Sequence, residues 1–175
     1  MGLREHRSQA ARCVRVCVLT LSDTRDASTD QSGAAIREGL TQDGHEVVAH
    51  EIVREDPVTL GERFDAILGR DDVDAVVLTG GTGIAPRDVA YELVNARYER
   101  ALPGFGELFR ALSYAEIGSA ALASRASAGV ARGKLVFSLP GSRNAVRLAL
   151  DQLIRPELGH LVGQLRAAGS PPEPS

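Results

Sequence analysis

Apolar and polar positions alternate in blocks along the chain, and these blocks predict a series of strands and helices. Unbroken aliphatic runs indicate strands covered on both faces, whereas apolar residues at helical spacing indicate amphipathic helices. The predicted strands are 14–21, 46–53, 74–78, 124–130 and 134–139, with a hairpin turn at 131–133. The predicted helices are 32–40, 58–68, 88–96, 108–114, 117–122 and 145–166. This alternation is typical of an α/β fold with a largely parallel sheet.

Length and composition narrow the class of protein. The 175 residues suffice for one domain with a full hydrophobic core. We expect a flexible N-terminal arm at 1–12, a single domain at 13–166 and a disordered, proline-containing tail at 167–175. We expect no nucleic-acid partner, because the net charge is −3, the pI is near 5.8 and the sequence has no tryptophan.

The sequence also argues against membrane, disulfide-bonded and zinc-binding proteins. No apolar run approaches the roughly 20 residues of a membrane span, and residues 1–12 lack the apolar core of a signal peptide, so we expect a cytoplasmic protein. Cys13 and Cys17 would lie about 13 Å apart along a strand, too far for a disulfide, and we expect buried thiols. The scattered histidines are expected on the surface rather than at a zinc ion: His6, His45, His50 and His160.

A glycine-rich turn follows the buried strand 74–78 and is the strongest candidate for a binding loop. Its residues are Gly80, Gly81, Thr82 and Gly83. Glycines let backbone N–H groups approach a ligand, and a helix predicted from Asp88 onward would favour an anion such as phosphate. The turn lacks the lysine of a Walker loop, and Pro86 replaces the third small residue of a dinucleotide fingerprint. A structural turn with Asp88 as an ordinary helix cap remains the alternative.

Acidic and small polar residues follow three other predicted strands. Ser22 and Asp23 end the first strand, where Asp23 is either a turn-former or a binding residue. Asp56 precedes Pro57 and is explained as a helix N-cap, whereas Glu55 has no such explanation. Glu55 and Asp88 together would suit Mg²⁺, which is commonly held by one or two carboxylates plus substrate phosphates.

Two further segments resemble loops with a binding role. The last strand ends in Pro140, Gly141 and Ser142, which repeats the plan of strand, small-residue turn and helix. Two such turns at one edge of a sheet could bind two phosphate groups. The turn-rich segment 98–107 contains Phe105 between two glycines, where its ring either fills the core or forms a wall against a flat ligand.

These motifs together resemble a molybdenum cofactor biosynthesis family that includes MogA, MoaB and the G-domain of gephyrin-type proteins. The match covers about residues 14–161, and the segments 116–118, 124–126 and 128–130 are more similar to the MoaB branch. It is carried by Ser22-Asp23, Asp30 before Gly33, Gly80-Gly81-Thr82-Gly83 with Arg87-Asp88, Pro103-Gly104-Phe105-Gly106-Glu107, and Pro140-Gly141-Ser142.

The resemblance implies a three-layer α/β/α fold of the molybdopterin-binding type, assembled as a homotrimer or homohexamer. It also implies that the protein binds molybdopterin and adenylylates its terminal phosphate with Mg-ATP, with a molybdenum-insertion protein as a further partner. A MoaB-type protein that binds molybdopterin without turnover is the alternative. The catalytic and Mg²⁺-binding residues would be Asp88 and Glu55. Glu55 occupies a position where the family usually has an aspartate after a proline, and Asp56 lies one step away.

The resemblance assigns the remaining site residues to substrate binding. They are Ser22, Asp23, Gly80, Gly81, Thr82, Gly83, Arg87, Gly104, Phe105, Gly106, Glu107, Pro140, Gly141 and Ser142.

Overall fold

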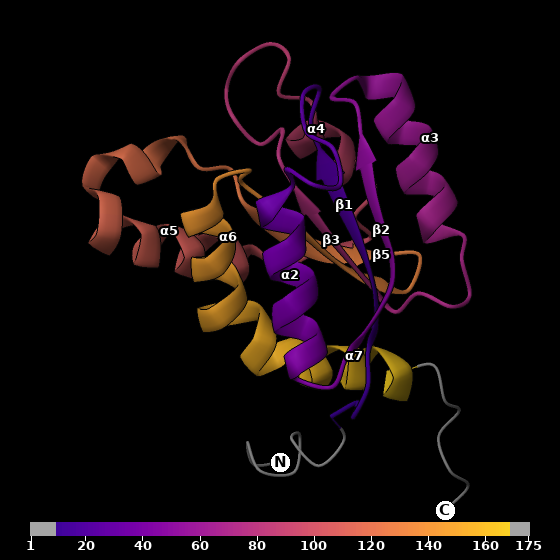
Figure 1. The fold of residues 1–175 in the computed structure, drawn as a ribbon. Coiled ribbons are helices and arrows are strands. Elements are labelled where there is room, and N and C mark those ends of the chain that lie inside the picture. The colour runs from indigo at the N-terminus through magenta and orange to yellow at the C-terminus, as the bar shows by residue number, and fades with distance from the viewer. Residues whose placement is uncertain (1–9, 169–175) are drawn as a thin grey trace, which may run out of the picture.

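The computed structural model describes residues 10–168, which form one six-stranded sheet with flanking helices (Figure 1). The strand order is β2-β1-β3-β6-β5-β4. The strands are β1 Arg15–Leu21, β2 Glu46–Val53, β3 Ala75–Thr79, β4 Arg100–Ala101, β5 Ser127–Ala131 and β6 Lys134–Leu139. The four strands β2, β1, β3 and β6 are parallel, whereas β5 pairs antiparallel with β6 and with β4. The sheet is therefore mostly parallel, as predicted.

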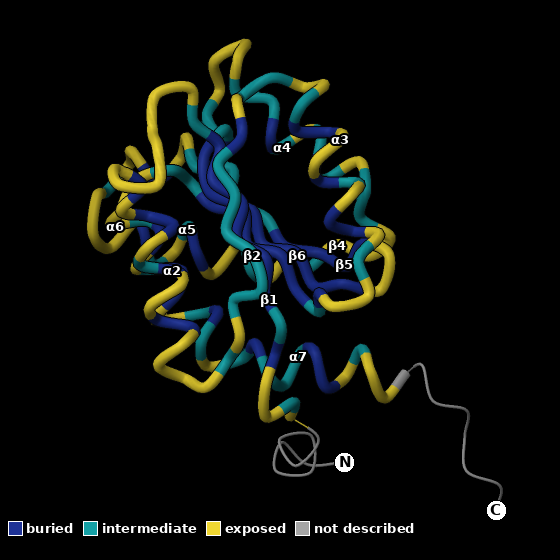
Figure 2. The backbone as a smooth tube through the Cα atoms, turned by 45° about the vertical axis from the view of Figure 1, so that its right-hand side comes forward, coloured by how far each residue is buried: buried dark blue, intermediate teal, exposed yellow. Residues whose placement is uncertain are grey.

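Helices cover both faces of this sheet and complete three layers (Figures 1 and 2). They are α2 Gln31–Gln42, α3 Pro57–Leu68, α4 Ala90–Asn95, α5 Pro103–Ile117, α6 Arg143–Ala149 and α7 Arg155–Ala168. Successive residues of a strand point to opposite faces, so β1 contributes to two cores. Val16 and Val18 pack with α2, α5, α6 and α7, whereas Cys17 and Leu19 pack with α3 and α4.

The four parallel strands end at the same edge of the sheet. Thr20 of β1 pairs with Thr79 of β3, and Thr79 in turn pairs with Leu139 of β6. Leu21 pairs with Val53 at the end of β2. Figure 2 shows the inner strands of the sheet largely buried, the edge strand β2 intermediate, and the loops beyond this edge largely exposed. The loops that follow the four strands therefore begin side by side, at the edge where open α/β sheets bind ligands.

The helix predicted at 88–96 is shorter than expected. α4 spans Ala90–Asn95 with Val89 as its N-cap, so Asp88 is not the helix cap. The carboxylate of Asp88 instead accepts a hydrogen bond from the N–H of Ala85 at 2.8 Å and closes a loop around Pro86. Because it is bonded backward to Ala85, the Asp88 carboxylate does not cap the N–H groups of the first helical turn.

The region after α4 also departs from the prediction. Residues 103–107 are the first turns of α5 rather than a turn-rich loop, because a proline is well suited to the first position of a helix. Residues 118–123 form a 3-10 helix, η1, and the two-residue strand β4 was not predicted. The hairpin turn between β5 and β6 is confirmed, with positive φ angles at Arg132 and Gly133.

The predicted helix 145–166 is a continuous helical segment with a π-helical turn. This turn, η2 Leu150–Ile154, connects α6 to α7. Pro156 has no N–H to donate to the carbonyl four residues earlier, and its ring would collide with that carbonyl. A wider turn before Pro156 avoids the collision, which accounts for the π-helical geometry.

The predictions for cysteines and histidines need correction. Cys17 is buried as expected, but Cys13 is exposed, because it precedes β1 and lies outside the sheet. His50 is only 19% exposed at its side chain and pairs with Asp30, and Nδ1 of His45 accepts a hydrogen bond from Val14 N–H. These two rings are therefore structural rather than solvated, while His6 lies outside the described residues. Between residues 10 and 168, no helix combines the length and the apolar character that a membrane crossing needs.

The expected arm and tail lie mostly outside the described residues. Within the expected arm, residues 10–12 are described, and Ala11 N–H donates a 2.8 Å hydrogen bond to the carbonyl of Gly159 in α7. A Cβ on Gly159 would lie 2.7 Å from the Ala11 carbonyl oxygen, so glycine permits this close approach. α7 itself continues to Ala168.

Candidate functional site

A cleft of about 520 Å³ lies at the carboxyl edge of the parallel strands. Its walls come from the loops after β1, β2, β3 and β6 and from the segment before β5. Most of the residues that the sequence assigned to a site line this one cleft: Ser22, Asp23, Glu55, Gly80, Gly81, Thr82, Gly83, Arg87, Asp88, Pro140, Gly141 and Ser142. The structure thus gathers segments that are far apart in the sequence.

The remaining four predicted site residues lie outside the cleft lining. Gly104, Phe105, Gly106 and Glu107 belong to the first turns of α5. The ring of Phe105 packs against Phe137 with centroids 5.2 Å apart, so it fills the core rather than forming a wall against a ligand. A Cβ on Gly106 would lie 2.8 Å from the carbonyl oxygen of Ala126, which explains that glycine by packing. These four residues do not line the cleft of one chain, and their substrate-binding role stays a prediction.

The two glycine turns lie against each other at the base of the cleft. A Cβ on Gly141 would lie 3.4 Å from the Cα of Gly80, and Thr79 Oγ1 donates a 3.0 Å hydrogen bond to the carbonyl of Pro140. Gly80 has a φ of 104°, and a Cβ there would lie 2.6 Å from the carbonyl oxygen of Leu21. Only glycine satisfies both the backbone angle and the space, so the turn brings main chain directly to the cleft.

Glu55 and Asp88 form the acidic wall of the cleft. Oε1 of Glu55 is buried and has no hydrogen-bond partner among the described residues. Burial raises the pKa of Glu55, and the negative charge of Asp88 raises it further. Gly81 and Gly83 provide the room for these groups, since a Cβ on Gly81 would meet Glu55 Oε1 and one on Gly83 would meet the Asp88 carboxylate.

This acidic pair fits a Mg²⁺ ion only together with phosphate ligands. Residues 10–168 contain no group of three or more His, Cys, Asp or Glu side chains that could hold a metal by themselves. Mg²⁺ commonly takes one or two carboxylates and completes its shell with water and phosphates, and the unpartnered oxygen of Glu55 beside Asp88 suits that donor set. Asp56 instead caps α3 by accepting a 2.9 Å hydrogen bond from Thr59 N–H, so Glu55 is the carboxylate that faces the cleft.

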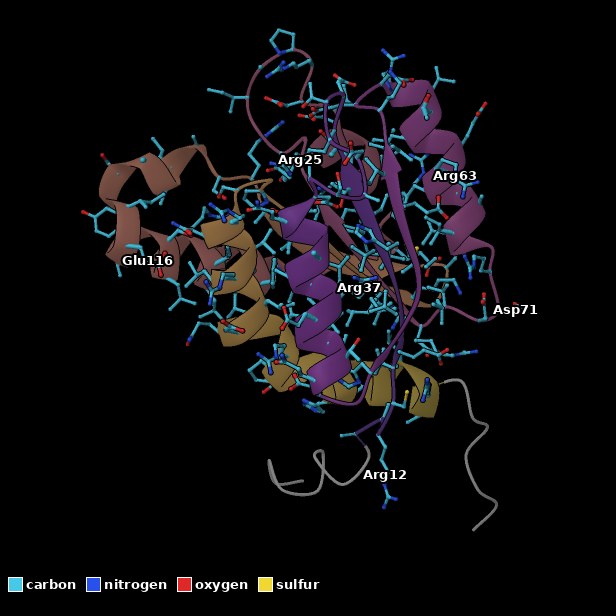
Figure 3. All side chains as sticks on the ribbon, viewed as in Figure 1. Arg12, Arg25, Arg37, Arg63, Asp71 and Glu116 are labelled. Atoms are coloured by element: carbon cyan, nitrogen blue, oxygen red, sulfur yellow. The ribbon has the colours of Figure 1, made fainter. Side chains whose placement is uncertain are left out.

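Several cleft residues were not identified from the sequence. Thr24 and Arg25 follow the predicted pair Ser22 and Asp23, and Arg25 lies on the same loop after β1 (Figure 3). An Arg25 Nη2 donor lies 3.5 Å from the Gly141 carbonyl and connects two walls of the cleft. Ser124 also lines the cleft, with an Oγ that is buried and unpartnered among the described residues. The sequence does not predict Ser124 in the cleft, because it predicts 124–130 as a continuous strand.

The buried carboxylate of Asp30 holds together elements next to the cleft. Asp30 accepts hydrogen bonds from Thr20 Oγ1 at 2.6 Å and from Gly33 N–H at 2.9 Å, and it pairs with His50 Nε2 at 2.8 Å. Burial by itself would raise the pKa of Asp30, but these hydrogen bonds outweigh burial and lower it. Asp30 thereby fixes the start of α2, whose Ser32 Oγ donates to the Gly141 carbonyl at 3.2 Å.

Comparison with known proteins identifies the family. Residues 17–160 match the family described as "Probable molybdopterin binding domain". The chain belongs to this molybdopterin-binding family. It is 48% identical over 166 residues to molybdenum cofactor biosynthesis protein B of Halalkalibacterium halodurans, covering 94% of this chain and 98% of that protein. It is also 48% identical over 167 residues to the protein of the same name from Bacillus subtilis, with coverage of 95% and 98%.

Solved structures of similar proteins agree with this assignment. The crystal structure of a molybdenum cofactor biosynthesis protein B matches with a TM-score of 0.87 and 47% identity, over 90% of this chain and 99% of that chain. The tungsten cofactor synthesizing protein MoaB from Pyrococcus furiosus matches with a TM-score of 0.77 and 37% identity, with the same coverage. The resemblance to the MoaB branch is confirmed, and the chain is assigned to molybdenum cofactor biosynthesis.

Proposed function

We propose that this protein adenylylates the terminal phosphate of molybdopterin with Mg-ATP. One observation carries the proposal: a buried oxygen of Glu55, without a hydrogen-bond partner among the described residues, lies beside Asp88 in a cleft with glycine turns at 80–83 and 140–142. Carboxylates suit a metal–nucleotide complex, and the two turns suit two phosphate-bearing ligands. The similarity to molybdenum cofactor biosynthesis protein B supports molybdopterin as one of these ligands.

The proposed reaction is a transfer of an adenylyl group between phosphates. An oxygen of the molybdopterin phosphate attacks the α-phosphorus of ATP, the bond to the β-phosphate oxygen breaks, and pyrophosphate leaves with the bonding electrons. Such a step depends mainly on positioning and on stabilising charge at the non-bridging oxygens. Mg²⁺, held by Glu55 and Asp88, would neutralise phosphate charge when bound.

The other cleft residues would orient the two substrates. The turn at 80–83 would bring main-chain N–H donors to one phosphate group, and Pro140, Gly141 and Ser142 would border the other. Arg87 lines the same cleft and would offset negative charge. Ser22 and Asp23 would hold the pterin, as the resemblance implies.

The proposal is tested by incubating the purified protein with molybdopterin, ATP and Mg²⁺. We expect adenylylated pterin and pyrophosphate in equal amounts. Asp88→Asn, which is nearly isosteric, should retain the fold and lose most of the transfer, by about 100-fold if positioning of the reacting groups is lost. Asp72→Asn is the matched control, because Asp72 pairs with Arg70 at the surface and does not line the cleft. Product formation by Asp88→Asn at the parental rate would remove Asp88 from the reaction.

A non-catalytic molybdopterin-binding protein is the second candidate. The raised pKa of Glu55 supports it, since a carboxyl group that resists ionisation is a poorer ligand for a cation. Equilibrium dialysis with molybdopterin separates the candidates. Binding without conversion in the presence of ATP and Mg²⁺ would support the binding protein and contradict the transferase.

We also propose that the protein assembles as a homotrimer or homohexamer. Large apolar side chains are exposed on α5 and η1: Leu108, Tyr114, Ile117 and, at 90% exposed, Leu122. Their burial against another copy would be favourable. Sedimentation should show a trimer or hexamer for the parent and a monomer for the double variant Ile117→Lys, Leu122→Lys. The cytoplasmic location and the molybdenum-insertion partner stay predictions.

A further inference from the structure

The side chain of Arg125 forms hydrogen bonds to the loop that carries Asp88. Its Nε donates a 3.0 Å hydrogen bond to the carbonyl of Thr82, and its Nη2 donates to the carbonyls of Gly83 and, at 3.2 Å, of Asp88. Nη1 forms an ion pair with Glu92 of α4. One guanidinium group therefore contacts the beginning of the loop, its end and the helix that follows.

This set of contacts requires an arginine. A guanidinium presents five N–H donors in a rigid plane, and the plane can also stack on an aromatic ring. The Cζ atom of Arg125 lies 4.7 Å from the ring centroid of Tyr91, and the side chain is only 24% exposed. Lysine carries the same charge but cannot reach three carbonyls and an aromatic face in one plane.

The loop is exposed at its tip, so the contact with Arg125 is well placed to hold it. Residues 82–89 lie between β3 and α4, and Ile84 at the tip is 78% exposed. Inside the loop, Asp88 N–H donates to the Ala85 carbonyl at 2.9 Å, and Asp88 Oδ2 accepts from Ala85 N–H. These bonds close the loop on itself, whereas Arg125 attaches it to the segment that leads into β5.

We propose that Arg125 is a positioning residue that holds the loop 82–88 so that Asp88 faces the cleft. Arg125 does not line the cleft, but its chain neighbour Ser124 does, so the segment that Arg125 attaches to the loop also contributes to the cleft lining. The catalytic consequence of the inference rests on the proposed adenylyl transfer. The effect of Arg125 on the conformation of the loop does not depend on that reaction, and it is measured separately.

Amide hydrogen exchange on the full chain tests the conformational part. In Arg125→Gln and Arg125→Lys, amides of 82–89 should exchange about tenfold faster than in the parent, while those of β1 and β3 stay unchanged. Glu92→Gln keeps the carbonyl contacts and should raise exchange less than Arg125→Gln does. Arg132→Gln is the matched arginine control, because Arg132 is exposed in the β5–β6 turn and contacts Asp65 instead.

Kinetics test the catalytic part on the same variants. Arg125→Gln should lower kcat by about 10–100-fold with a smaller change in the KM for molybdopterin, because misplaced groups slow the chemical step. Parental exchange at 82–89 in Arg125→Gln would overturn the inference, as would faster exchange spread over the whole sheet. If the parent makes no adenylylated pterin, the proposed function fails, while local exchange at 82–89 still decides the role of Arg125.

Discussion

Oε1 of Glu55 lies 2.7 Å from the position that a Cβ on Gly81 would occupy. The same Cβ would lie 2.9 Å from the Cβ of Ala90, and the φ of Gly81 is 65°. Gly81 therefore has a left-handed backbone and a side-chain position that is already filled by a carboxylate. The glycine turn and the acidic wall of the cleft are thus one packed unit.

Gly81→Ala should disturb the cleft more than the fold. The left-handed backbone costs about 1–2 kcal/mol, so Tm should fall by about 2–8 °C, and displacement of Glu55 should abolish most adenylyl transfer. Gly44→Ala is the matched control, since its φ is 81° and, apart from Gly44 and its two chain neighbours, no described residue has an atom within 4 Å of the added Cβ. Thermal unfolding should show a larger Tm loss in Gly81→Ala than in Gly44→Ala, because the Cβ added at Gly81 also collides with Ala90. Product assays should show activity only in Gly44→Ala. Equal activity in both variants would contradict this role of Gly81.

Glu55→Gln should separate the function of Glu55 from its effect on stability. The folded protein buries a carboxylate oxygen without a hydrogen-bond partner among the described residues, next to the charge of Asp88. Replacing this carboxylate by a neutral isostere should leave the free energy of unfolding equal or raise it by about 1 kcal/mol. Adenylyl transfer should fall strongly if Glu55 is a ligand of Mg²⁺ as proposed, because that ligand is lost. Urea unfolding and the transfer assay measure the two effects, and a clear loss of stability would show that Glu55 is instead a structural group.

Asp74 should make stability depend on acidic pH. Burial by itself would raise its pKa, but hydrogen bonds from Arg15 side chain and backbone and from Arg166 hold it well below the ordinary range. A carboxyl group with a lowered folded pKa stabilises the protein above its unfolded pKa, near 4, and loses this contribution as pH falls. Asp74→Asn should lower the free energy of unfolding by about 1–3 kcal/mol at pH 7 and by less at pH 3.

Urea unfolding of Asp74→Asn at both pH values measures this difference, with Asp72→Asn as control. A hydrogen bond from Arg70 lowers the pKa of Asp72 to about 2, but its side chain is 57% exposed. Solvent screening makes such pairs contribute little, so Asp72→Asn should change stability by less than about 1 kcal/mol. A pH-independent loss in Asp74→Asn would disprove the electrostatic explanation.

Asp30 and Asp56 allow a comparison of two helix caps. Both accept a backbone hydrogen bond at the start of a helix, from Gly33 and Thr59 respectively. Asp56→Ala removes a cap and should cost about 1 kcal/mol. Asp30→Ala also leaves Thr20 and His50 without their carboxylate partner, so it should cost about 2–4 kcal/mol. Chemical denaturation of the two variants gives the difference, and equal losses would show that the buried network adds nothing to the cap.

Much of the fold was predictable because local patterns and tertiary packing agree. The aliphatic run before Gly80 is β3, and Asp56 with Pro57 starts α3 as expected. The two turns that the sequence predicts as binding loops, at 80–83 and 140–142, line the same cleft. Phe105 was ambiguous because two flanking glycines suggest a loop, whereas packing on Phe137 and a proline at the helix start place it in α5.

The sequence by itself determined most of the order of elements, the mostly parallel sheet and the edge where its loops meet, because strand and turn preferences act between neighbouring residues. Only the tertiary structure decided which carboxylate faces the cleft, that Asp88 closes a loop instead of capping a helix, and that Arg125 holds that loop. These features depend on contacts between residues far apart in the chain. Their energies come from burial and from hydrogen-bond geometry, which exist only once the strands are side by side.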